Sequence, residues 1–191
     1  SALLIPALAH AKLNVVATTP ELAAIAREVA GSRADVVSLA KPTEDTHFVD
    51  PKPSFVRKLA SADLVVEGGA ELEIGWLPPL MEGARNPKLG HIAVAPGMQL
   101  LGIPATLDRS KGDVHAMGNP HFMTDPINGK IAAQRIAEEL SKLDPAGAET
   151  YRENLAKFAG RLDAKLAEWQ KTLAPFAGKQ VVAYHDTWPY F

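Results

Sequence analysis

Residues 13–39, LNVVATTPELAAIAREVAGSRADVVSL, contain a complete strand–helix–strand pattern. The apolar run at residues 13–18 predicts a buried strand, and Thr19 with the proline after it is typical of a helix N-cap and first helical position. Helical apolar spacing then continues to Gly31, and residues 35–39 predict a second strand. This order is typical of parallel strands joined by a crossover helix.

The pattern repeats further along the chain. A helix is predicted to begin at Pro53, a third strand covers residues 63–67, and a fourth covers residues 91–95. We therefore predict an α/β fold with a doubly wound, mostly parallel sheet in an N-terminal lobe of residues 12–143. Ligand sites in such sheets lie outside the carboxyl ends of the strands.

Two helices are predicted after the fourth strand. Asp125, followed by proline, is typical of an N-cap. The second helix begins after Asp144 and has an apolar stripe with steps of three and four residues, formed by Tyr151, Leu155, Phe158, Leu162, Leu166, Trp169 and Leu173. From residue 145 to residue 173 it would be about 43 Å long. We predict that residues 144–177 form a long interdomain helix.

Residues 180–185 predict one more strand. A single strand at the far end of a long helix cannot form a domain. We therefore expect residues 178–191 to begin a second α/β lobe whose remainder lies beyond Phe191. The alternative is a strand that returns to the first sheet.

The composition limits the classes of function. The 191 residues are 47% hydrophobic and 22% charged, as in ordinary globular proteins. The net charge of −2 does not favour a nucleic-acid partner. These 191 residues contain no cysteine, so within them we expect no disulfide, no thiolate metal site and no lipidated-cysteine anchor, and any metal must be held by imidazole and carboxylate groups.

Residues 1–11 are predicted to be the remnant of a signal peptide. The stretch is apolar, and Ala9-His10-Ala11 fits the small-x-small pattern of a cleavage site. We therefore expect an exported protein. The alternative is a short apolar element that belongs to the fold.

Three histidines stand in distinctive polar loops or at strand ends: His47, His121 and His185. A single loop histidine is more often solvated or structurally bonded than a metal ligand. Three imidazoles from such positions can nevertheless converge on one metal ion without performing any chemistry.

The surroundings of these histidines resemble a known family. Residues 43–54 (TEDTHFVDPKPS), 118–126 (GNPHFMTDP) and 184–191 (YHDTWPYF) are similar to the three ligand loops of the cluster A-I solute-binding proteins. These are periplasmic proteins that capture zinc or manganese for ABC importers. The long predicted helix is similar to the rigid interdomain helix of that family.

The resemblance implies that His47, His121 and His185 are metal ligands and that the metal is delivered to an ABC permease. The family's fourth ligand, a carboxylate near the end of the second lobe, would lie beyond Phe191. Zn²⁺ is favoured because imidazole suits zinc, whereas manganese-type relatives commonly have glutamate at the third position. Mn²⁺ or iron is the alternative.

Four nearby residues have more ordinary interpretations. His115 is predicted to be a solvated loop histidine, with transient metal binding as the alternative. Asp125 is expected to cap a helix and at most to support His121. Asp45 is interpreted as a solvated acid that could also steer cations. Asp186 should point away from the face of His185 if this stretch is extended.

Other functions remain open at this stage. A three-histidine zinc hydrolase would need a general base near the metal, and no such pairing is evident, so we expect no enzyme. A surface adhesin or metal chaperone is a further alternative within the same family. An exposed strand edge at residues 180–185 would also favour a dimer.

Overall fold

The computed structural model describes residues 11–107 and 115–191. Its single sheet has the order β2-β1-β3-β4, and every neighbouring pair is parallel. The strands are β1 (Leu13–Ala17), β2 (Ala34–Ser38), β3 (Leu64–Glu67) and β4 (Gly90–Ala93). The predicted parallel sheet is therefore confirmed, with boundaries shifted by one or two residues.

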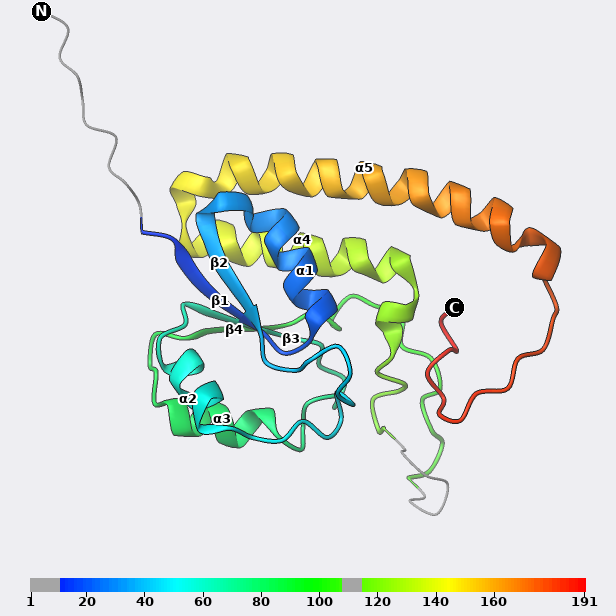
Figure 1. The fold of residues 1–191 in the computed structure, drawn as a ribbon, viewed down its shortest axis with the longest axis horizontal. Helices are drawn as coiled ribbons and strands as arrows, with labels where there is room; N and C mark the ends of the chain where they lie inside the picture. The colour runs from blue at the N-terminus through cyan, green and yellow to red at the C-terminus, as the bar shows by residue number, and fades with distance from the viewer. Residues whose placement is uncertain (1–10, 108–114) are drawn as a thin grey trace, which may run out of the picture.

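Helices cover both faces of the sheet (Figure 1). One layer contains α1 (Pro20–Ala30), α4 (Pro126–Leu143) and α5 (Ala148–Leu173), and the other contains α2 (Pro53–Ala60) and α3 (Leu77–Ala84). Within β1, Val15 and Ala17 belong to the core under the first layer, while Val16 belongs to the core under the second. This alternation of side chains gives the doubly wound fold two buried faces.

Helix α3 was not predicted from the sequence. It is short, and Pro78 and Pro79 follow its first residue. Prolines are tolerated there because the N–H groups of the first turn have no partner within the helix. Its N-cap residue, Trp76, is almost completely buried and supports the functional site described below.

The strand order places a topological switch point between β1 and β3. From β1 the chain crosses to β2 on one side, and from β2 it returns to β3 on the other. Connections that diverge in this way leave a crevice at the carboxyl ends of the two strands. His47 lies on the same edge of the sheet, in the loop between β2 and α2.

Helix α5 crosses the layer of α1 and α4 and continues past it (Figure 1). Its 26 residues correspond to about 39 Å. The predicted apolar stripe is buried near its start, where Tyr151 is inaccessible, but Trp169 and Leu173 remain 41% and 43% exposed. The predicted start was early, because Pro145–Gly147 form a 3-10 turn before the α-helix begins.

The predicted strand at residues 180–185 is wrong. No strand is assigned there, and Val182 and Tyr184 are fully exposed. An extended segment becomes a strand only by pairing with a neighbour, and none of residues 11–107 or 115–191 pairs with it. The predicted start of a second α/β lobe therefore has no strand in this structure, and the predicted dimer through a strand edge loses its basis.

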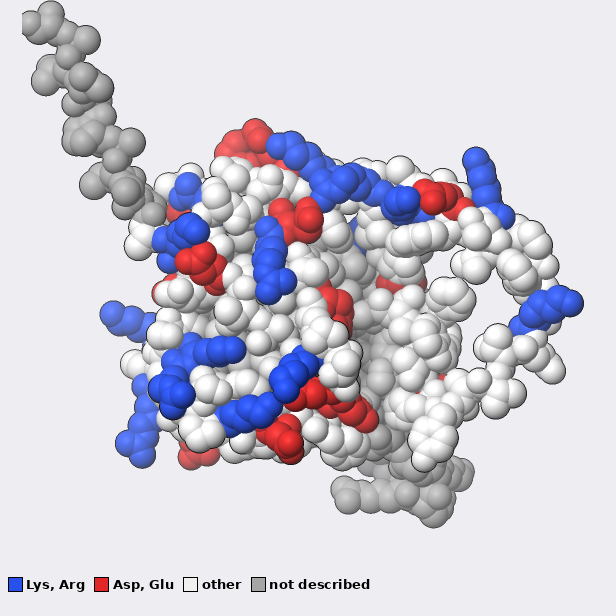
Figure 2. Space-filling view, in the orientation of Figure 1, with Lys and Arg blue, Asp and Glu red and all other residues white. Residues whose placement is uncertain are grey.

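The face shown in Figure 2 has no large region of a single charge. Figure 2 shows basic and acidic side chains interspersed over the visible face, and the chain beyond α5 is largely uncharged. Within the described residues, no helix has the length and apolarity needed to cross a membrane. The predicted signal-peptide remnant lies outside the described residues, except for Ala11.

Candidate metal centre

Three histidines from distant parts of the chain meet at one point. One ligand nitrogen from each of His47, His121 and His185 lies within 4.8 Å of the others. The Nε2 atoms of His121 and His185 are 2.8 Å apart, and the ring centroid of His47 is 5.0 Å from that of His121. The structure thus brings together all three residues that were predicted to form a metal site.

His47 is oriented by a carboxylate. The backbone N–H of His47 donates to Asp45 Oδ1 at 2.9 Å, and its ring Nδ1 lies 3.1 Å from the same oxygen. Since a carboxylate only accepts, Nδ1 carries the proton and the neutral ring has its lone pair on Nε2. Asp45 thus has a specific supporting role that the sequence interpretation missed.

The charge state of Asp45 agrees with that role. Burial would raise the pKa of the Asp45 carboxyl, but hydrogen bonds from the backbone and ring of His47 outweigh it and hold the pKa below its usual value. A second hydrogen bond holds the loop that carries His47: the Trp76 indole N–H donates to the Thr46 carbonyl oxygen at 2.9 Å. The residue before His47 is therefore tied to the buried start of α3.

His121 lies in the loop that leads into α4. Its backbone N–H donates to Asn119 Oδ1 at 2.9 Å, and its carbonyl oxygen accepts from the Thr124 hydroxyl at 2.8 Å. Burial, followed by the charges that His47 and His185 would carry, lowers the pKa of His121 to about 4. This imidazole is therefore neutral at pH 7, as metal binding requires.

His185 reaches the site because the segment after α5 folds back toward the loop before α4 (Figure 1). The Asn119 side-chain amide donates to the Asp186 carbonyl oxygen at 2.6 Å. The Tyr190 hydroxyl donates to the Asn119 carbonyl oxygen at 2.6 Å and accepts from the Leu101 N–H at 2.8 Å. These connecting roles of Asn119 and Tyr190 were not predicted, because the partners are about 70 residues apart in sequence.

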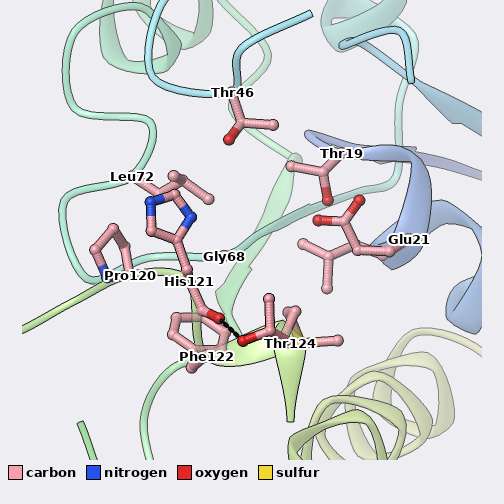
Figure 3. Close-up of a pocket in the computed structure, with 11 residues that line it drawn as sticks. Thr19, Glu21, Thr46, Gly68, Leu72, Pro120, His121, Phe122 and Thr124 are labelled. Atoms are coloured by element: carbon pink, nitrogen blue, oxygen red, sulfur yellow. Dashed lines mark hydrogen bonds between the residues drawn. The ribbon is translucent and has the colours of Figure 1, made fainter. Parts of the chain in front are cut away.

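A cavity of about 200 Å³ lies beside His121 at the switch point. Figure 3 shows the His121 imidazole on one side of it and Thr19 on the other, with Gly68 near the end of β3. The buried Glu73 carboxylate fixes this end by accepting from the Thr18 hydroxyl at 2.6 Å and from the Gly68 N–H at 2.8 Å. Burial raises the pKa of Glu73.

Three further predictions concern neighbouring residues. Thr19 is the N-cap residue of α1, but its hydroxyl makes no capping hydrogen bond. Asp125 caps α4 as predicted, accepting from the Ile127 N–H at 2.8 Å. Asp186 is held by Asn119, whose amide lies 3.2 Å from its carboxylate.

The prediction that His115 is a solvated histidine is wrong. Its Nε2 lies 3.1 Å from Nε2 of His47, and the two ring centroids are 5.0 Å apart. The two residues are 68 positions apart, so no local pattern could predict this contact.

The three predicted donors suit a small divalent cation. Zinc binds imidazole nitrogen at about 2.0–2.1 Å, which in a tetrahedral site places ligand atoms about 3.3 Å from one another. The 2.8 Å between the Nε2 atoms of His121 and His185 needs only a small spreading of the rings to reach that value. The carboxylate on Nδ1 of His47 is also a common feature of metal-bound histidines.

Several known proteins are similar to this chain. The chain is 34% identical over 186 residues to the metal ABC transporter substrate-binding lipoprotein ScbA of Streptococcus cristatus. It is 33% identical over 187 residues to the manganese ABC transporter substrate-binding lipoprotein PsaA of Streptococcus pneumoniae. Each match covers 94% of this chain and 58% of the relative, so the chain spans somewhat over half the length of these proteins.

A similar solved structure is a ZnuA deletion mutant with zinc bound, with a TM-score of 0.82 and 27% identity, covering 94% of this chain and 65% of that one. The family model described as zinc-uptake complex component A, periplasmic (ZnuA), matches residues 15–191. The match includes both the parallel sheet and the segment that carries His185, and this chain therefore belongs to the ZnuA family.

Proposed function

We propose that this chain captures a metal ion outside the cytoplasmic membrane and delivers it to an ABC permease. The observation that carries this proposal is the convergence of His47, His121 and His185 from three separate segments. Relatives are named as substrate-binding components of metal ABC transporters, and that role needs capture and release but no catalytic residue. We therefore infer binding, and neither hydrolysis nor adhesion.

We propose Zn²⁺ as the cargo. Three imidazoles form a nitrogen-rich set, which suits zinc better than manganese, since manganese is more often bound by oxygen ligands. The names of the relatives support both metals: PsaA is named for manganese, whereas the similar ZnuA structure contains zinc. Mn²⁺ is therefore the competitor that a binding experiment must include.

We also propose a role for each of three segments of the chain. Residues 12–143 form the metal-binding lobe, residues 144–177 the connecting helix, and residues 178–191 the beginning of the opposing part. The exposed apolar side chains at the end of α5 and beyond it support this division, because they have room for further packing: Trp169, Leu173, Phe176, Val181, Val182 and Tyr184. A periplasmic location fits the description of the family.

The test is calorimetric titration of metal-stripped protein with Zn²⁺ and with Mn²⁺. We expect one zinc site per chain, with manganese bound more weakly. His121→Ala should abolish tight binding because it removes a central donor. The matched control is His91→Ala, since His91 pairs with Glu67 at 3.0 Å and is not one of the three converging histidines.

Each result of the titration has a different consequence for the proposal. Zinc binding that is lost in His121→Ala and kept in His91→Ala supports metal capture at this site. Preferential manganese binding would keep the transport role but overturn the choice of cargo. Equal zinc binding by both variants and the unmodified chain would overturn the site.

A further inference from the structure

A buried hydroxyl group lies next to the metal centre. Thr19 is completely inaccessible to solvent, and within residues 11–107 and 115–191 its Oγ1 has no hydrogen-bond partner. It also makes none of the hydrogen bonds by which a threonine at this position usually caps a helix. Burying a hydroxyl without a partner is unfavourable, so Thr19 indicates that the protein binds a polar group at this point.

The cavity of about 200 Å³ at the switch point is bordered by this residue. Thr19 and Glu21 lie on one side of it, and Figure 3 shows the Nδ1 side of the His121 ring directed across it toward Thr19. A water molecule takes up about 30 Å³ in the liquid and needs two to four polar partners when it is buried. The cavity therefore has both the room and the polar groups to hold one.

His121 needs an acceptor on this side of its ring. Its Nε2 is 2.8 Å from Nε2 of His185, so Nε2 is the nitrogen that faces the shared metal position. A neutral ring offers a lone pair on Nε2 only when its proton is on Nδ1. Asp45 lies 3.1 Å from Nδ1 of His47, but Nδ1 of His121 has no such partner in the described part of the chain.

We propose that Thr19 is a positioning residue for the ligand His121 and acts through a water molecule bound in this cavity. The water accepts the Nδ1–H of His121 and donates to Thr19 Oγ1 and to the Glu21 carboxylate. It thereby fixes the tautomer and the orientation of the ring, as Asp45 does for His47. This inference rests on the proposed metal-capture function and adds a supporting residue to it.

Thr19→Val tests this role because valine has nearly the shape of threonine but no hydroxyl. Thr19 Oγ1 has no partner in the described chain, so thermal unfolding should show no loss of stability in the metal-free variant. Nitrogen-15 NMR of that variant near pH 7 should show a smaller fraction of the Nδ1–H tautomer of His121. Zinc affinity, measured by competition with a chelator, should fall by about 10-fold. Thr19→Ser, which keeps a hydroxyl, should restore both values.

Thr172→Val is the matched control, since its hydroxyl donates to the Glu168 carbonyl oxygen on the exposed part of α5. It should change neither the tautomer of His121 nor the zinc affinity. An unchanged tautomer fraction in Thr19→Val would overturn the proposal, and so would an equal loss of affinity in Thr19→Ser. An unmodified chain that held no zinc would overturn the proposed function, whereas the tautomer of the metal-free protein would still decide whether Thr19 orients His121.

Discussion

The side-chain amide of Asn119 donates a hydrogen bond to the backbone carbonyl oxygen of Asp186 at 2.6 Å. The Oδ1 atom of the same side chain accepts from the backbone N–H of His121, two positions further along the chain, and Asp186 directly follows His185. One asparagine therefore connects the two segments whose imidazoles lie 2.8 Å apart at Nε2. We therefore expect the long-range assembly of the site to depend on this side chain.

Asn119→Ala should weaken zinc binding by about 10–100-fold, the usual cost of removing a group that orients metal ligands. The variant loses both the acceptor for His121 and the donor to Asp186. Calorimetry measures the change. The control is Asn154→Ala, which removes an amide hydrogen bond to the Val29 carbonyl oxygen elsewhere in the fold. Equal zinc affinities in the two variants would contradict the connecting role of Asn119.

Asp45→Asn should also lower zinc affinity by about 10–100-fold, because the amide is a weaker acceptor for Nδ1 of His47. The same method applies. Asp50→Asn is the matched control, since Asp50 is an exposed acid five residues away and the change in net charge is identical. If both substitutions reduced affinity equally, Asp45 would act through general electrostatics and not by orienting the imidazole.

Zinc affinity should fall as the pH is lowered from 8 to 4. Only neutral imidazole binds the metal, and His121, whose pKa is lowered to about 4 mainly by burial, becomes protonated at the acid end of this range. Chelator competition at fixed ionic strength measures the affinity at each pH. An affinity that did not change across this range would exclude histidine as the dominant ligand type.

The metal-free protein should lose stability as the pH falls from about 6.5 to about 4. The pKa of His121 is lowered to about 4 in the fold, mainly by burial, so the unfolded chain binds this proton more readily than the folded chain. Urea unfolding at several pH values gives the free energy of unfolding. His121→Gln should make its decline with acidity shallower.

His91 provides a control of opposite sign for that experiment. A hydrogen bond with the Glu67 carboxylate is the largest of the effects that raise the pKa of His91 above its usual value. Its protonation therefore favours the folded chain at low pH, and this contribution is lost as the pH rises through its folded pKa. His91→Gln should make the loss of stability with acidity steeper. The same change of slope in both variants would contradict the assignment.

Tyr151→Phe should lower the free energy of unfolding by about 1–2 kcal/mol without changing zinc affinity. The buried Tyr151 hydroxyl donates to Asp144 Oδ2 at 2.7 Å, and Arg33 Nε donates to the same oxygen at 2.7 Å. This cluster connects the start of α5, the C-cap residue of α4 and the 3-10 turn that follows α1. Tyr184→Phe, at a fully exposed position, should leave stability unchanged. Chemical denaturation compares the two, and equal stabilities would show that the buried hydroxyl contributes nothing.

Local signals in the sequence were enough to predict most of the sheet. The β1–α1–β2 unit was predictable because its periodicity changes from strand to helix and back within 27 residues, with a proline and a glycine near the helix ends. Helix α3 was missed because two prolines interrupt a short apolar stretch. The predicted strand at residues 180–185 had suitable side chains, but strand formation also needs a hydrogen-bonding neighbour.

The sequence by itself determined the alternation of strands and helices, the absence of thiol ligands and the polar loops that carry His47, His121 and His185. Those properties depend on residue type and short-range spacing. Only the tertiary structure decided that these three imidazoles meet, that Asp45 and Asn119 orient them, and that His115 faces His47. The contacts of His121 with His185, of Asn119 with Asp186 and of His115 with His47 each join residues more than 60 positions apart. Their proximity depends on how the sheet, the loop before α4 and the return of the chain after α5 pack together.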